Sequence, residues 1–102
     1  MPNTQNFRTR HMRWMILLTL NHARPLGGND SMVLQVMQAE YADATLVELR
    51  RELDYLHRRE LITLQRPEDG GPWYAELSRH GVDVVEYTVE CDAGIDRPQK
   101  YW

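Results

Sequence analysis

The sequence predicts an α+β domain that is mainly helical. Three observations lead to this fold class. Apolar residues recur at helical spacing up to about residue 60, the period then changes from 3.6 to 2 across two short runs, and another helical pattern follows. The chain has 102 residues, of which 42% are apolar and 26% are charged, so we expect one domain with a modest core.

Two helices are predicted before residue 42. Residues 7–23 combine a high density of apolar side chains with no glycine or proline, which indicates a helix with a wide buried face. The run "ARPLGGND" ends this helix because Pro25 cannot continue it, and residues 24–26 are a candidate for a small strand. Asp30 or Ser31 is the expected N-cap of the next helix, which runs to about residue 41.

The third helix, predicted over residues 45–60, has the clearest periodic pattern in the chain. Thr45 with Glu48 matches a capping box, in which each side chain satisfies a free N–H group at the start of the helix. Four leucines at 3-4-3 spacing form a stripe that faces the core, and they are Leu46, Leu49, Leu53 and Leu56. This stripe determines which side chains of the helix point outward.

A hairpin and a last helix follow. Residues 61–66 and 72–77 are predicted as two strands joined by the turn "PEDGG". Ser78 is expected to cap a helix that runs to residue 90, with an inner face made of Val82, Val85 and Val89. We place the domain in residues 1–90 and treat residues 91–102 as a C-terminal tail, whose two final aromatic residues are expected to dock in a groove of the same chain or of a partner.

The stretch from Leu53 to Tyr87 resembles the second half of a winged helix-turn-helix domain. In "LDYLHRRELI" a helix gives way to an apolar strand, and "YAELSRHG" is similar to the Y-x-L-T/S-x-x-G phrase of PadR-type and MarR-type regulators, with one extra residue after Tyr74. The end "RPQKYW" also resembles small winged-helix proteins of Mu-like prophages. The resemblance implies a three-helix core, a β-wing of two or three strands and a C-terminal helix.

The same resemblance implies a DNA-binding transcriptional regulator of bacterial or prophage origin that acts in the cytoplasm. The third helix would enter the major groove of double-stranded DNA, and the hairpin would lie along the backbone or in the minor groove. Arginine binds guanine edges, and arginine or tyrosine holds phosphates, so outward residues of the helix and the base of the wing are the candidate contacts. These candidates are Arg50, Arg51, Tyr55, Arg58, Arg59 and Arg66.

The outward face of the third helix also has a purely structural interpretation. Glu48 with Arg51, and Asp54 with Arg58, are spaced for ion pairs along the helix. Each such pair contributes a few tenths of a kcal/mol. On this interpretation the face is an ordinary solvated surface.

The distribution of charge favours a second functional hypothesis, a protein–protein interaction module such as a phage assembly or adaptor subunit. Residues 45–60 hold four arginines and four acidic residues, and the wing tip carries Glu68 and Asp69, where DNA-binding wings more often carry basic residues. Residues 1–29 hold four arginines and no acid, whereas the rest of the chain is acidic and brings the net charge to −3. Such a module would use the acidic wing, the basic first helix and the aromatic tail.

A homodimer is also expected. Small winged-helix proteins often associate through their first and last helices, and the first helix here has more apolar surface than a domain of this size buries alone. Four aromatic residues are the candidate contacts with a second copy or another partner, and they are Phe7, Trp14, Tyr101 and Trp102.

No catalytic residue, metal site or cofactor is expected. The four histidines show no paired spacing, although a zinc site needs two to four converging ligands, and no glycine-rich phosphate loop follows a strand. Cys91 is the only cysteine, which fits a reducing cytosol. The longest apolar run, Trp14 to Leu18, is far shorter than the roughly 20 residues of a membrane-spanning helix, so no membrane contact is expected.

Overall fold

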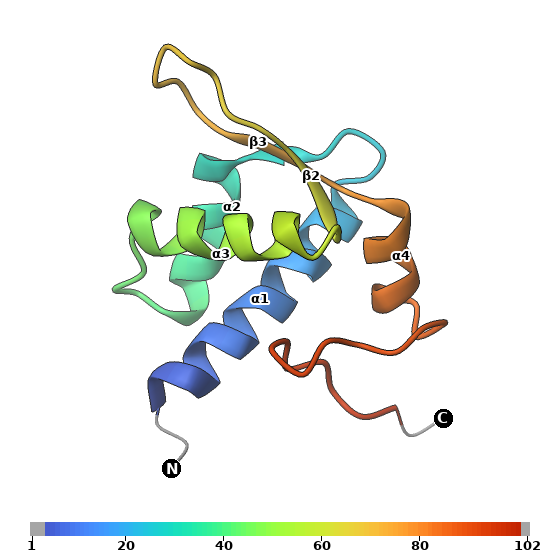
Figure 1. The fold of residues 1–102 in the computed structure, drawn as a ribbon. Helices are drawn as coiled ribbons and strands as arrows, with labels where there is room; N and C mark the ends of the chain where they lie inside the picture. The colour runs from blue at the N-terminus through green and yellow to red at the C-terminus, as the bar shows by residue number, and fades with distance from the viewer. Residues whose placement is uncertain (1–3, 101–102) are drawn as a thin grey trace.

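Residues 4–100 are described by the computed structural model (Figure 1). In chain order the elements are α1 (Thr4–His22), β1 (Gly28–Asn29), α2 (Asp30–Glu40), α3 (Leu46–Arg58), β2 (Ile62–Gln65), β3 (Tyr74–Leu77) and α4 (Arg79–Val85). The predicted fold class is confirmed, because α1, α2 and α3 form a helical core, β2 and β3 form a hairpin, and α4 follows the hairpin. This is the arrangement of a winged helix-turn-helix domain, with β2 and β3 as the wing.

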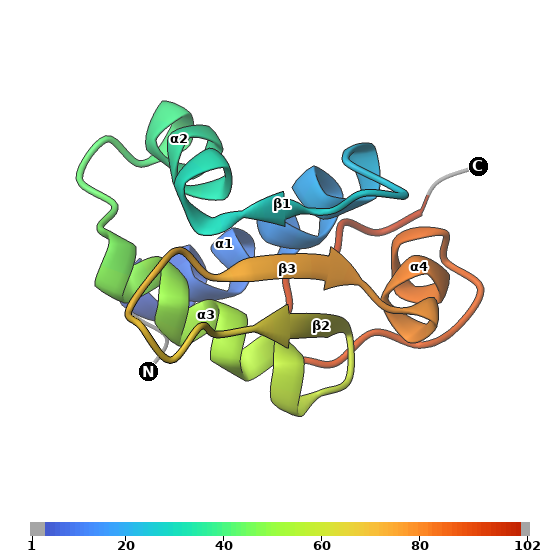
Figure 2. The same cartoon turned by 90° about the horizontal axis from the view of Figure 1, so that it is seen from above.

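The three strands form one antiparallel sheet in the order β1-β3-β2 (Figure 2). Within the hairpin, Ile62 lies opposite Leu77 and Gln65 lies opposite Tyr74. Leu77 is buried whereas Tyr74 is exposed, as the alternation of apolar and polar residues in the two strands predicts. The hairpin therefore has one face on the core and one face toward solvent.

The small strand predicted at residues 24–26 lies instead at Gly28–Asn29. Residues 23–27 form the turn after α1, in which the N–H groups of Leu26 and Gly27 donate to the carbonyl oxygen of Ala23 at 3.0 and 3.2 Å. Gly27 has a φ of +76°, and a Cβ atom there would meet the carbonyl oxygen of Ala75 on β3. The chain reaches the sheet only after this turn, which moves the strand toward the C-terminus.

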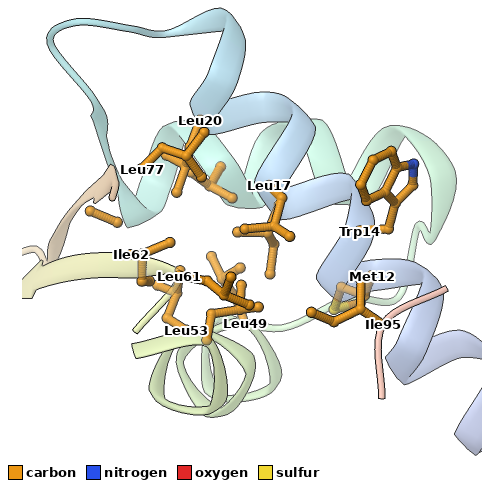
Figure 3. Close-up of a cluster of buried hydrophobic side chains, with 14 of the residues drawn as sticks. Met12, Trp14, Leu17, Leu20, Leu49, Leu53, Leu61, Ile62, Leu77 and Ile95 are labelled. Carbon is orange, nitrogen blue, oxygen red and sulfur yellow. The ribbon is translucent and has the colours of Figure 1, made fainter. Parts of the chain in front are cut away.

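The core lies between α1, α3 and the inner face of the sheet (Figure 3). Leu17 and Leu20 of α1 and Leu49 and Leu53 of α3 belong to one cluster, and all four side chains are fully buried. Ile62 of β2 closes the cluster from the side of the sheet. Since each buried side chain of this size contributes about 1.5–3 kcal/mol, this cluster accounts for the position of α3 under the hairpin.

Of the two N-caps predicted for α2 and α3, one differs from the structure and one is confirmed. Asn29 caps α2 through Oδ1, which accepts a hydrogen bond from the N–H group of Met32 at 2.9 Å. The prediction of Asp30 or Ser31 was therefore wrong, because β1 carries extended backbone up to Asn29 and the helix begins directly after it. Thr45 caps α3 as predicted, with Oγ1 accepting from the N–H group of Glu48 at 3.1 Å.

The end of α3 is set by a residue that is not glycine. Glu60 has a φ of 63°, and the N–H group of Leu61 donates back to the carbonyl oxygen of Leu56 at 3.0 Å. This bond closes the last turn of the helix and directs the chain into β2. Three members of the predicted leucine stripe are fully buried, whereas Leu46 is only partly buried.

α4 ends at Val85, five residues before the predicted end. Tyr87 has a φ of 64°, and the N–H group of Thr88 donates to the carbonyl oxygen of Asp83 at 3.0 Å, which closes the helix. In this shorter helix the fully buried valine is Val84. The predicted inner face is confirmed in part, since Val82 and Val85 are half-buried against the core, whereas Val89 lies beyond the helix and is exposed.

The segment after α4, residues 91–98, packs against the helices. Ile95 belongs to the buried cluster of the core together with Met12 of α1 (Figure 3). The N–H group of Asp96 donates to the carbonyl oxygen of Arg10 at 3.0 Å, and the guanidinium of Arg97 donates to the carbonyl oxygen of Val84 at 2.9 Å. The predicted aromatic anchors Tyr101 and Trp102 lie outside the described residues.

Candidate nucleic-acid interface

α3 and the hairpin lie on the same side of the molecule. In Figure 1 α3 runs across the front, and the hairpin returns above it in the opposite direction. In Figures 1 and 2 the turn between β2 and β3 lies above the N-terminal half of α3. The buried residues of α3 are Leu49, Glu52, Leu53 and Leu56. The opposite face of the helix is formed by Val47, Arg51, Asp54 and Arg58.

Two acidic side chains of α3 turn away from this outward face and toward α1. The carboxylate of Glu48 accepts two hydrogen bonds from the Arg8 guanidinium, at 2.8 and 2.9 Å. Glu52 is buried and accepts from Nε of Arg13 at 2.7 Å. Arg8 and Arg13 of the first helix are therefore engaged inside the chain, where they neutralise carboxylates of α3.

The electrostatics of Arg8 agree with this arrangement. Hydrogen bonds to the carboxylates of Glu48 and Asp43 raise the pKa of the Arg8 guanidinium above its ordinary value. Asp43, in the connection between α2 and α3, lies 2.7 Å from Nη1 of Arg8, and this hydrogen bond lowers the pKa of the Asp43 carboxyl. Arg8 thus joins α1 to the connection between α2 and α3 and to the first turn of α3.

Arg51 and Arg58 remain as exposed cations on the outward face of α3. Within residues 4–100 neither side chain makes an ion pair or a side-chain hydrogen bond. The ion pairs expected along the helix are not the ones observed, because Glu48 pairs with Arg8 and Asp54 pairs with Arg66 at 2.9 Å. The outward face of α3 is consequently more basic than the composition of the helix indicates.

Arg50 occupies a different place from the one predicted for it. Its guanidinium turns toward Asp30 at the start of α2, with Nε and Nη2 at 2.9 and 2.7 Å from Oδ2. The same carboxylate oxygen accepts from the backbone N–H group of Trp73 at 3.1 Å. Asp30 is almost completely buried, so this ion pair fixes the base of the wing to α2 and α3.

The indole of Trp73 organises two arginines at the base of the wing. The guanidinium carbons of Arg50 and Arg66 lie 4.8 and 5.1 Å from the centre of its ring, within the range of cation–π contacts. Arg66 is also held by Asp54 of α3. The sequence did not mark Asp30 or Trp73 as site residues, and the only signal was an aromatic residue beside a predicted turn.

Tyr55 and Arg59 face the C-terminal segment. The hydroxyl of Tyr55 donates to Oδ1 of Asp92 at 2.8 Å, and Nη1 of Arg59 lies 3.2 Å from Oδ2 of the same residue. The guanidinium carbon of Arg13 lies 3.5 Å from the centre of the Tyr55 ring. Burial and the Asp92 carboxylate raise the pKa of the Tyr55 hydroxyl.

The wing tip carries its two acids at an exposed turn. Asp69 uses Oδ1 to accept a hydrogen bond from the N–H group of Gly71 at 2.9 Å, so it has a local role in the turn. Glu68 is exposed, and residues 67–73 contain no basic side chain. The candidate cationic contacts therefore lie on α3 and at the base of the wing, not at its tip.

Of the residues predicted to contact a partner, one lies at the surface and one lies in the core. Phe7 is 58% exposed and is available to a partner. Trp14 is buried in the core of its own chain, with its ring 6.2 Å from that of Tyr87. On α2, Met32 and Val36 are exposed apolar residues one turn apart.

Comparison with known proteins does not assign a family to the chain. No family model, no curated protein and no solved structure matches the chain. Among residues 4–100 no group of three or more histidine, cysteine or acidic side chains is arranged to hold a metal ion. No helix in the same range is long and apolar enough to cross a membrane.

Proposed function

We propose that this chain is a winged helix-turn-helix module that binds double-stranded DNA through the outward face of α3. The observation that carries the proposal is the separation of charge on that helix. Glu48 and Glu52 face α1 and are neutralised by Arg8 and Arg13, whereas Arg51 and Arg58 face solvent without an ion pair within residues 4–100. A helix with this arrangement presents cations to a polyanion although its composition is neutral.

The two exposed arginines of α3 have a spacing that suits a groove. Arg51 and Arg58 lie seven residues apart, so their Cα atoms are separated by roughly 10 Å along the helix axis. Arginines on an exposed helix face bind guanine edges in the major groove or the phosphates that border it. Arg66, at the start of the wing loop, is an exposed further candidate on the side of the hairpin, where it pairs with Asp54 of α3.

The resemblance to PadR-type and MarR-type regulators supports a role in transcriptional regulation, in a bacterium or a prophage, in the cytoplasm. In that role the chain would act as a homodimer on paired half-sites. Phe7 is the exposed candidate for the contact between copies. Light scattering at micromolar concentration should give a dimer mass, and a monomer mass would reject this part of the proposal.

Duplex binding measured against salt tests the proposal. The double variant Arg51→Ala/Arg58→Ala should bind a short random-sequence duplex about tenfold to a hundredfold more weakly at low salt and show a shallower salt dependence. The matched control is Arg24→Ala/Arg79→Ala, which removes the same charge from exposed positions outside α3. If the unmodified protein does not bind any duplex even at low salt, the DNA-binding function is rejected.

A second candidate function is protein binding without DNA, as in a phage assembly or adaptor subunit. It is favoured by the exposed Met32 and Val36 on α2 and by the acidic wing tip. Residues 31–39 contain no charged side chain, which suits contact with an apolar protein surface. A folded protein that binds no duplex would support this candidate in place of the first.

A further inference from the structure

The carboxylate of Asp92 lies against the C-terminal flank of α3. Oδ1 accepts hydrogen bonds from the Tyr55 hydroxyl at 2.8 Å and from the N–H group of Gly94 at 2.7 Å. Oδ2 lies 3.2 Å from Nη1 of Arg59. Figure 1 shows the segment that carries Asp92 passing below this half of α3, on the side opposite the hairpin.

The segment around Asp92 is anchored independently of this carboxylate. Ile95 is buried in the core, and the guanidinium of Arg13 donates to the carbonyl oxygen of Gly94 at 2.9 Å. Nε of Arg10 donates to the carbonyl oxygen of Ala93 at 3.1 Å. Asp92 is therefore presented to α3 by a fixed piece of backbone, and replacement of its side chain leaves these other contacts in place.

The donors around Asp92 are those that bind a phosphate. A tyrosine hydroxyl and an arginine guanidinium on the flank of a helix commonly hold the DNA backbone beside a groove. A carboxylate and a phosphodiester both accept such hydrogen bonds through negatively charged oxygens. The Asp92 carboxylate thus engages two donors of the kind that a backbone phosphate uses.

We propose that Tyr55 and Arg59 form a binding site for a phosphate of the DNA backbone, which Asp92 occupies while the protein is free. This inference rests on the proposed function and adds Arg59 as a third cationic contact of α3 beside Arg51 and Arg58. The Arg59 side chain is 54% exposed, so its pair with Asp92 is accessible to solvent and weak enough for a phosphate to replace it. Asp92 therefore lowers the affinity of the protein for DNA.

Asp92 also closes the turn at residues 92–95, and the variant must leave that function intact. Asparagine keeps the oxygen that accepts from Gly94 and Tyr55 but removes the negative charge. Asp92→Asn is therefore the test variant, and Asp92→Ser is a second one because serine also forms this type of turn. The matched control is Asp96→Asn, which removes a charge from the same segment at a residue that pairs with Arg10 of α1 at 3.8 Å.

The experiment measures binding of the full chain to a short random-sequence duplex over a range of salt concentrations. Asp92→Asn should bind about threefold more tightly than Asp96→Asn at low salt, with a log–log salt slope steeper by about 0.9, the increment for one additional phosphate. Adding Arg59→Ala to Asp92→Asn should abolish the gain. Urea unfolding at neutral pH confirms that each variant is folded.

Three outcomes would overturn the inference, and they separate it from the proposed function. Equal gains in the Asp92 and Asp96 variants would show only an effect of net charge. A gain that survives Arg59→Ala would place the added contact elsewhere. In both cases, loss of binding in Arg51→Ala/Arg58→Ala would leave the proposed function standing, whereas the absence of duplex binding in every variant would reject both.

Discussion

The buried carboxylate of Asp30 lies 2.7 Å from Nη2 of Arg50 and joins three parts of the fold. Asp30 begins α2, Arg50 lies in the middle of α3, and the carboxylate also accepts from the N–H group of Trp73 at the base of the wing. The N–H group of Asp30 in turn donates to the carbonyl oxygen of Trp73 at 2.9 Å. Asp30 is therefore one of the residues that fix the orientation of the hairpin relative to α3.

Asp30→Ala should lower the free energy of unfolding by about 2–3 kcal/mol, because it leaves the Arg50 guanidinium and the Trp73 N–H group without their acceptor. Asp30→Asn keeps a hydrogen-bond acceptor and should therefore lower the free energy of unfolding by less than Asp30→Ala. Urea unfolding measures both changes. The control Glu68→Gln removes an exposed acid at the wing tip and should change the free energy by less than about 0.5 kcal/mol. Equal stability of Asp30→Ala and the unmodified protein would contradict the role given to this carboxylate.

Gly81→Ala should destabilise the protein by about 2 kcal/mol although alanine is the better helix former. A Cβ atom at residue 81 would meet the carbonyl oxygen of Leu61 and the side chain of Leu77, which is where α4 packs against the start of β2. Thermal or urea unfolding measures the loss. Gly71→Ala is the matched control, since the atoms nearest to its Cβ would belong to the side chains of Asp69 and Pro67 in the exposed turn. A stabilised Gly81→Ala would mean that α4 does not pack this closely.

Thr45→Ala should lower the free energy of unfolding by about 1 kcal/mol, because the N–H group of Glu48 loses its acceptor at the start of α3. Thr9→Ala removes the same hydroxyl from within α1 and should not reduce stability, since alanine favours the helix. The two variants are compared by urea unfolding under the same conditions. A loss as large in Thr9→Ala would show that the effect does not come from the cap.

The elements that the sequence predicted well are those determined by neighbouring residues. The leucine stripe of α3, the caps at Thr45 and Ser78 and the alternation of the hairpin all depend on spacings of a few residues, and each is confirmed. The predicted C-terminal ends of α3 and α4 lie beyond the ends that the structure shows, at Arg58 and Val85. Both helices end through Glu60 and Tyr87 at positive φ, where glycine is the usual signal.

The candidate site was harder to predict because its geometry depends on residues far apart in the chain. The sequence treats Arg50, Arg51 and Arg59 as one outward group, but only Arg51 is without an ion pair within residues 4–100. Arg50 is directed to Asp30, 20 residues earlier, and Arg59 to Asp92, 33 residues later. Such ion pairs depend on tertiary packing, so no local sequence pattern predicts them.

The pKa of Asp92 predicts how stability changes with pH. The N–H group of Gly94 and the Tyr55 hydroxyl lower the pKa of the Asp92 carboxyl in the folded state. A group with a lowered folded-state pKa stabilises the fold above its unfolded pKa of about 3.9, and this contribution is lost as pH falls through the folded-state value. Its size should be about 1 kcal/mol, because the carboxylate is partly exposed and screened by solvent.

Asp92→Asn should therefore be less stable than the unmodified protein at pH 7, and the difference should shrink as the solution is acidified below about pH 4. Urea midpoints at a series of pH values measure this convergence. Glu68→Gln serves as the control because Glu68 is exposed, so its difference from the unmodified protein should stay near zero throughout. A stability difference for Asp92→Asn that is constant with pH would show that the ionised carboxylate of Asp92 does not stabilise the fold through Tyr55 and Gly94.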